Sequence, residues 1–173
     1  MGTRSRIGVM HGDVCKSVYC HWDGYLEHNG VILQEHYDSA RANQLVALGD
    51  MSTLGPVLGQ AHSFSKLDIT DTDADREAKL ALMELAQSEG WCTFYGRDRG
   101  ETGADFAVDH NFADFVSRAV NCGAEYYYIM KDGVWYVGNT HENDTKYYKK
   151  LVLLLKALVD EMEVSKNWET VDL

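Results

Sequence analysis

The sequence predicts an α+β domain in which an antiparallel sheet is covered by helices. Short apolar and β-branched runs, bounded by glycine-containing turns, indicate β-hairpins at residues 5–22 and 125–137. Longer segments with apolar residues at helical spacing indicate helices between and after these hairpins. The chain has 173 residues and shows neither an internal repeat nor a low-complexity linker, which favours a single domain over residues 1–173.

In the first half, the expected elements are strands at residues 5–10 and 14–22, one or two helical turns at 31–37, and a helix at 39–48. The turn of this hairpin is expected around Gly12. Ser39 can cap the helix at its start, and Gly49 can end it. Residues 50–75 contain the only proline and an acidic tract, so we expect a long mobile loop there.

In the second half, the expected elements are a helix at residues 76–88, a strand at 91–95, a loop at 96–101, a helix after Asn111, strands at 125–130 and 134–137, and a helix at 145–164. Asp75 can cap the first of these helices. The Asp132-Gly133 pair favours a tight primed turn. The C-terminal helix is long and leucine-rich, and a polar tail at residues 166–173 follows it.

The charge balance limits the partners of this protein. It has 27 acidic and 16 basic side chains, a formal net charge of −11, which disfavours direct binding to nucleic acid. The same acidity would suit a protein that imitates DNA and occupies a host factor. No apolar stretch is long enough to cross a membrane, and residues 1–6 lack the apolar core of a secretory signal. Four cysteines without a framework spacing fit reduced thiols, so we expect a cytosolic protein.

We expect neither a metal nor a cofactor. Cys15 and Cys20 lie five residues apart in one predicted strand and therefore face opposite sides, which argues against zinc binding with His21. The acidic run at residues 71–75 resembles the start of a calcium loop, but Arg76 stands where that loop needs glycine. The common nucleotide-binding, esterase and zinc-protease motifs are absent from the sequence.

A dense cluster of functional side chains occupies the corner after the first hairpin. The corner reads Tyr-Cys-His-Trp-Asp-Gly-Tyr over residues 19–25, and it continues to His28 and Gly30. Its candidate ligand-binding side chains are those of His21, Trp22, Asp23, Tyr25 and His28. The aromatic rings can stack on a base, while imidazole and carboxylate groups can read polar edges. An alternative is that His21, Asp23 and His28 meet as a general acid–base group.

A second cluster reads Tyr-Gly-Arg-Asp-Arg-Gly-Glu over residues 95–101. Guanidinium groups bind phosphate or carboxylate with two parallel hydrogen bonds, and flanking glycines permit close approach of a ligand. Tyr95, Arg97 and Arg99 are therefore candidate ligand-binding residues. The alternative is that both arginines pair with internal carboxylates, either of this segment or of the corner.

These motifs carry a resemblance to a known family. A family of small phage and prophage proteins has, in this order, Gly2-Thr3-Arg4-Ser5-Arg6-Ile7-Gly8, the corner, and residues 33–37, 47–50, 52, 54–55, 95–101 and 135–137. The chain resembles that family over most of its length, although Leu26 stands where members often have proline. The family has no established activity, so the resemblance implies a setting, the cytoplasm of an infected bacterium, and no reaction.

Together, the residues and the resemblance lead to a phage accessory protein that binds a nucleotide-like anion without converting it, as in the sequestration of a host defence signal. Arg4, Arg97 and Arg99 would hold phosphate. One alternative is an acidic inhibitor of a host protein, and the other is a hydrolase or transferase using the acid–base group of the corner. The leucine-rich helix and exposed strand edges are compatible with a homodimer.

Overall fold

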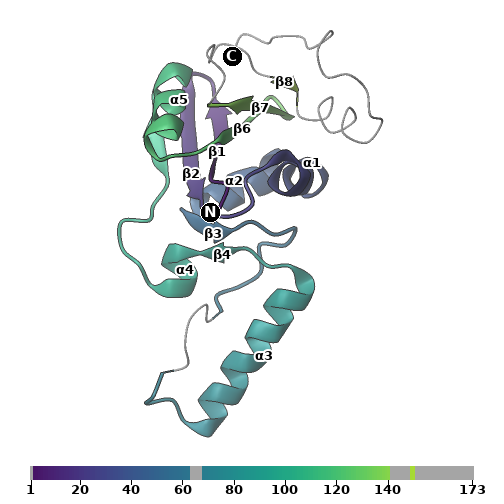
Figure 1. Cartoon of the computed structure of the whole chain (residues 1–173), viewed down its shortest axis with the longest axis vertical. Helices are drawn as coiled ribbons and strands as arrows, with labels where there is room; N and C mark the ends of the chain where they lie inside the picture. Colours follow the sequence, from purple (N-terminus) through teal and green to yellow (C-terminus); the bar gives the residue numbers. More distant parts are fainter. Residues whose placement is uncertain (1, 63–67, 141–148, 151–173) are drawn as a thin grey trace.

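The computed structural model describes residues 2–62, 68–140 and 149–150 (Figure 1). In this part of the chain, one mixed sheet has the strand order β4-β3-β2-β1-β6-β7-β8, and β5 pairs with β2 beside that path. The strands are β1 (Ser5–His11), β2 (Val14–Cys20), β3 (Met51–Thr53), β4 (Thr93–Phe94), β5 (Ala107–Asp109), β6 (Tyr126–Lys131), β7 (Val134–Asn139) and β8 (Lys149–Lys150). The helices are the π-helical turn η1 (Leu26–Gly30), α1 (Val31–His36), α2 (Ser39–Ala47), α3 (Asp73–Glu89), α4 (Tyr95–Arg99) and α5 (Phe112–Asn121).

The mixed α+β class is confirmed, but the prediction of an antiparallel sheet is wrong. β1 pairs with β6 in parallel, and β2 pairs with β3 in parallel. Parallel neighbours need a crossover connection, and the helical segment between β2 and β3 provides one of them. The sequence pattern reveals the hairpins because their strands are adjacent in the chain. It does not reveal which distant strand fills the free edge of each hairpin.

Both predicted hairpins are present. β1 and β2 are antiparallel with Ser5 opposite Cys20, and β6 and β7 are antiparallel with Lys131 opposite Val134. Asp132 and Gly133 have φ values of 50° and 79°. Two consecutive positive φ angles are the requirement of a primed two-residue turn, which suits the twist of the flanking strands.

Helices cover both faces of the sheet, and each face has its own core. α1 and α2 pack on one face, where Ile7, Val18, Leu45 and Tyr128 are fully buried. α5 packs on the other face, where Phe115 contacts the ring of Tyr127. Helix α5 follows the prediction closely, with Asn111 as its N-cap. Alternation along each strand divides the apolar residues between the two cores.

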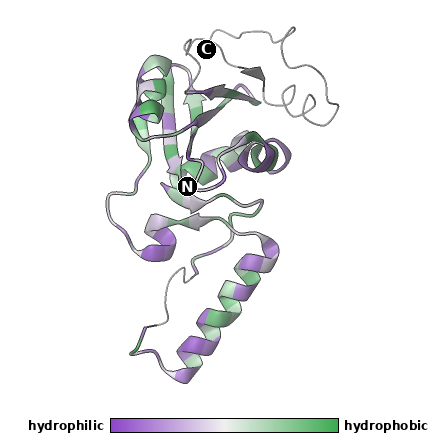
Figure 2. Ribbon diagram, in the orientation of Figure 1, coloured by the Kyte–Doolittle hydropathy of each residue, from purple (hydrophilic) through white to green (hydrophobic). Residues whose placement is uncertain are grey.

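Helix α3 extends away from the sheet (Figure 1). Hydrophobic and hydrophilic residues are interleaved along it (Figure 2). Ala86 is its only buried residue, whereas Leu80 and Leu85 are exposed. The helix begins earlier than predicted because Thr72 is the N-cap, and Asp75 completes a capping box from inside the first turn.

Several short elements differ from the predictions. Residues 51–53 form β3 inside the expected loop at 50–75, and β5 was not expected. Residues 95–99 form the short helix α4, not a loop, and it ends at Gly100 with φ 68°. Asp38, not Ser39, caps α2. Elements of three to five residues carry too little periodicity to be read from sequence, and the partner strands of β3 and β5 are distant in the chain.

The predicted helix at residues 145–164 and the polar tail at 166–173 lie largely outside the described residues. Lys149 and Lys150 are described, and they form β8 against β7 instead of a helix. A homodimer through this helix therefore stays a prediction. None of the helices in the described part combines the length and apolar character that a membrane span requires.

Candidate functional site

The face of the sheet that carries α5 also carries a row of polar and aromatic residues at the open end of the first hairpin. Arg6 lies opposite Tyr19 in the β1–β2 register, so the next same-face pair along the hairpin is Arg4 and His21. The Arg6 guanidinium is buried and donates from Nε to Ser17 Oγ at 2.8 Å. Arg6 thus belongs to the interior, and the row reaches the surface at Arg4, Tyr19 and His21.

Three rings form the centre of this row. The Tyr19 hydroxyl lies 2.7 Å from His21 Nδ1. The His21 ring stands edge-on to Trp22, with 4.6 Å between the ring centroids. Trp22 is 44% exposed, and its ring lies so close to Gly2 that a β-carbon there would overlap it. Trp22 therefore offers a fixed aromatic surface to solvent.

Strand β3 brings the arginine segment beside this corner. The backbone amide of His21 donates to Met51, and that of Tyr95 donates to Asp50. Ser52 forms a side-chain hydrogen bond to Tyr95. The two clusters that sequence reasoning singled out are thus neighbours, joined by a strand that it did not predict.

Arg99 lies over the Tyr95 ring, with its guanidinium carbon 5.3 Å from the ring centroid. It also approaches Glu101 at 3.8 Å. Burial raises the pKa of both Tyr19 and Tyr95, so both phenols keep their protons at neutral pH and can donate hydrogen bonds.

Arg4 is the second cation of the row. Its side chain is exposed, and within the described residues its guanidinium forms no hydrogen bond or ion pair. It nonetheless acts on Tyr19, whose pKa it lowers against the larger effect of burial. Because no carboxylate in the described part of the chain neutralises it, Arg4 is well suited to an anionic ligand.

Arg97 is placed differently from Arg99. Its guanidinium donates to Asp98, to the Leu58 carbonyl at 2.9 Å and to the Cys92 carbonyl at 3.0 Å. These internal acceptors use the hydrogen-bonding capacity that a phosphate would need. Arg97 therefore pairs with internal acceptors, as the alternative interpretation of this segment expects, and does not face a ligand.

The remaining predicted residues lie in the turn after the row. Asp23 takes a left-handed conformation with φ 56°, and Tyr25 is 37% exposed, with its ring 6.1 Å from that of His28. His28 Nδ1 lies 2.9 Å from Asn29 Oδ1. Among the described residues, no hydrogen bond, ion pair or ring contact joins the side chains of His21, Asp23 and His28. The geometry therefore does not assemble an acid–base group from them.

Sequence reasoning missed Ser5 and Asn29, which hold the corner in shape. Asn29 is fully buried, and its amide nitrogen donates to Ser5 Oγ at 3.2 Å and approaches Cys20 Sγ at 3.4 Å. A buried amide must satisfy its hydrogen bonds, so it fixes the chain segments that it joins. An asparagine beside a glycine signals a turn in sequence and gives no sign of this role.

The described part of the chain contains no group of three or more His, Cys, Asp or Glu side chains placed to hold a metal ion. Cys15 and Cys20 belong to the two different cores of the sheet, as their odd spacing predicted.

Comparison with protein-family models, with curated proteins and with solved structures gives no match to this chain.

Proposed function

We propose that this protein is a phage accessory protein that binds a nucleotide-like anionic small molecule, without converting it, on the row formed by Arg4, Tyr19, His21, Trp22, Tyr95 and Arg99. The observation that carries the proposal is the placing of two guanidinium groups beside a set of aromatic rings. Arg4 lies near Tyr19, and Arg99 lies over Tyr95. Nucleotides combine a π-surface with negative charge, and this row offers a partner for each.

Each side chain has a defined part in this binding. The exposed ring of Trp22 stacks on the base. Arg4 takes the phosphate, because it has no acceptor to give up among the residues that the structure describes. Arg99 lies over the Tyr95 ring and presents its guanidinium to the phosphate beside that ring. Arg97, Tyr25 and His28 are not part of the row, and Asp23 lies at its margin.

The negative overall charge makes the guanidinium groups of Arg4 and Arg99 more important for anion binding. With a net charge of −11, the protein repels free anions at long range. Anion binding then depends on local, directed hydrogen bonds, and weak non-specific attraction contributes little. The resemblance to phage proteins suggests the host bacterial cytoplasm as the setting and a host defence signal as a ligand to be sequestered.

The test is calorimetric titration with a panel of linear and cyclic nucleotides, followed by mass spectrometry of the recovered ligand. We expect binding of at least one nucleotide, recovered with unchanged mass. Arg4→Ala and Trp22→Ala should each weaken binding about tenfold or more, a loss of about 1.4 kcal/mol. Arg76→Ala, an exposed arginine on α3, is the matched control and should bind normally. Absence of heat and of thermal stabilisation across the panel would refute the proposal.

A second candidate function is inhibition of a host protein, and α3 is the observation that favours it. This helix extends from the sheet and exposes Leu80 and Leu85 among acidic residues. Exposed apolar side chains on a charged helix suit a protein interface with electrostatic steering. Affinity capture from bacterial lysate at low salt tests this candidate. A partner retained by the wild type and lost with Leu80→Asp plus Leu85→Asp supports it, whereas equal capture by both proteins contradicts it.

A further inference from the structure

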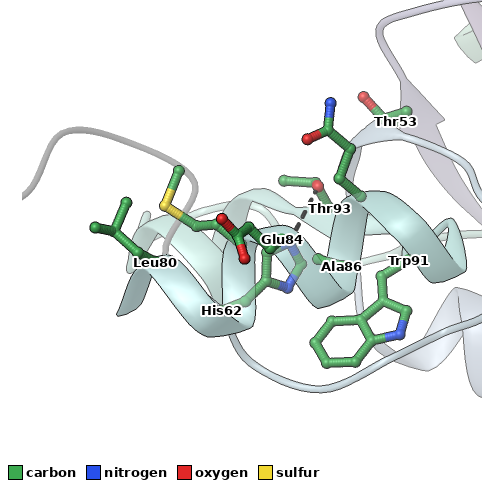
Figure 3. A pocket seen from close by; sticks show the side chains of 9 residues that line it. Thr53, His62, Leu80, Glu84, Ala86, Trp91 and Thr93 are labelled. Atoms are coloured by element: carbon green, nitrogen blue, oxygen red, sulfur yellow. Dashed lines mark hydrogen bonds between the residues drawn. The ribbon is translucent and has the colours of Figure 1, made fainter. Parts of the chain in front are cut away.

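A cavity of about 550 Å³ lies between α3 and strands β3 and β4 (Figure 3). This volume is in the range of small-molecule sites. Leu80, Met83 and Trp91 supply apolar lining, and Glu84 adds a carboxylate. The cavity is separate from the binding row, because none of the six residues of the row is among the residues that line it.

The notable group in the cavity wall is His62, whose side chain is only 5% exposed. Its Nδ1 lies 2.9 Å from the carbonyl oxygen of Gln60. Because a carbonyl can only accept, this contact assigns the ring proton to Nδ1. Nε2 lies 3.4 Å from Thr93 Oγ1 (Figure 3). When the ring is neutral, Nε2 carries its lone pair and can accept the proton of the Thr93 hydroxyl.

Asp98 stands behind the imidazole. Its side chain is fully buried, and Oδ1 lies 3.5 Å from His62 Nδ1. The carboxylate is held in place because it accepts from the backbone amides of His62 at 3.1 Å and Phe94 at 2.7 Å. The Trp91 ring contacts the imidazole edge-on, at 5.5 Å between centroids. The Gln60 carbonyl orients the imidazole, Asp98 fixes the backbone of His62, and Nε2 faces the Thr93 hydroxyl, so a base and a hydroxyl are held together as an activated nucleophile requires.

We propose that this cavity is an acyl-transfer site that hydrolyses small neutral esters, with Thr93 as nucleophile, His62 as general base and Asp98 as positioning residue. Thr93 Oγ1 forms a bond to the ester carbonyl carbon, and its proton passes to His62 Nε2. The ester C–O bond breaks, and the leaving alkoxide takes that proton. Water then attacks the acyl-threonine, which releases the acid and restores the hydroxyl.

The lining limits the substrate class. Leu80, Met83 and Trp91 favour an apolar acyl group. The Glu84 carboxylate at the same cavity disfavours anionic substrates by like-charge repulsion. A nucleotide therefore suits the row and not this cavity, so the two proposals concern different ligands and can fail separately.

The first test is covalent labelling of the full chain with an alkyl fluorophosphonate, a neutral reagent for activated hydroxyls. Thr93 Oγ1 should form a bond to phosphorus as fluoride leaves, and peptide mass spectrometry should place the adduct on Thr93. Thr93→Val and His62→Gln should abolish the adduct, and Thr93→Ser should keep it. Thr70→Val and His36→Gln, two exposed residues, are the matched controls and should be labelled normally. An unlabelled wild type, or an adduct on another residue only, would overturn the proposal.

The second test is hydrolysis of p-nitrophenyl acetate and butyrate, with circular dichroism to confirm that each variant is folded. We expect kcat to fall at least 100-fold in folded Thr93→Val and His62→Gln. Asp98→Asn should lower kcat and leave KM unchanged. Partial unfolding would lower the apparent kcat in the same way, but it would also reduce the ellipticity, so circular dichroism separates the two causes. Wild-type rates that persist in folded Thr93→Val would overturn the proposal, whatever the outcome of nucleotide binding.

Discussion

Arg97 Nε lies 2.9 Å from Asp98 Oδ1, and the Asp98 side chain has no exposed surface. The guanidinium also stacks on Phe94, 4.7 Å from the ring centroid, and bonds to the carbonyl of Leu58. This pair therefore ties α4 to β4 and to the chain before His62. It explains why Arg97 turns inward while Arg99 faces the binding row.

Loss of Asp98 should destabilise the fold strongly. Asp98→Ala leaves Arg97 without its carboxylate, and breaking a buried ion pair from one side costs about 3–5 kcal/mol. Urea unfolding monitored by circular dichroism measures the loss. The matched control is Glu101→Ala, which removes the exposed partner of Arg99 and should cost about 1 kcal/mol or less. Equal losses in the two variants would contradict the structural role of the Arg97–Asp98 pair.

Two glycine-to-alanine substitutions should have opposite effects. A β-carbon at Gly138 would overlap the ring of Tyr127, so Gly138→Ala should destabilise by about 1–3 kcal/mol. At Gly96, inside α4, the nearest heavy atom to a β-carbon is the Glu101 oxygen at 3.8 Å. Gly96→Ala should therefore stabilise by about 0.5–1 kcal/mol, since alanine favours a helix. Thermal unfolding of both variants decides, and a stabilised Gly138→Ala would refute this packing.

The four thiols should differ sharply in reactivity. Burial raises the pKa of Cys15 and Cys20 to about 12, and burial also raises the pKa of Cys92. At pH 8, a thiol with this pKa is ionised to the extent of about 10⁻⁴, and the thiolate is the nucleophile. Cys122 is only half-buried. Iodoacetamide should thus alkylate Cys122 in the native protein, and the other three only after urea is added; early alkylation of Cys20 would be inconsistent with this core.

The start of α3 should respond to acid. A side-chain hydrogen bond from Thr72 lowers the pKa of Asp75 below its usual 3.8. An acid whose folded pKa is depressed stabilises the fold above its unfolded pKa, and this contribution is lost as the pH falls through the folded value. We therefore expect helical ellipticity to decrease as the pH falls below about 4.

The Thr72→Ala variant isolates the cause of this shift. It should raise the pKa of Asp75 back toward 3.8, as measured by carboxyl-carbon NMR. Asp68 provides an internal control, because its pKa is lowered by the amide and hydroxyl of Thr70 and should not change. An unchanged pKa at Asp75 would show that Thr72 does not cause the shift.

The candidate site could be predicted only in part. The sequence identifies Trp22, Tyr95 and Arg99 as chemically distinctive, and the fold does bring their segments together. The sequence does not show that the side chains of Arg99 and Arg97 point in different directions. In α4, residues 95 and 99 share one face because they are four apart, while residues 97 and 98 point elsewhere. That separation requires a helix where the sequence predicts a loop.

His62 carried no signal in sequence, since its partners are distant along the chain. Asp98 lies 36 residues away and Thr93 lies 31 residues away. The parallel strand pairs of the sheet likewise join segments that are distant along the chain. Local patterns alone determined both hairpins, the span of α5 and the amphipathic body of α3, because turn geometry and helical periodicity act between near neighbours.

Tertiary structure decided the rest. It set the parallel pairing of β1 with β6, placed β3 between the two predicted clusters, and directed Arg97 inward and Arg99 outward. These outcomes depend on backbone hydrogen bonds and buried charges whose partners come from remote parts of the chain. Only the packed fold brings those partners into contact, and short elements such as β3 and α4 exist because of it.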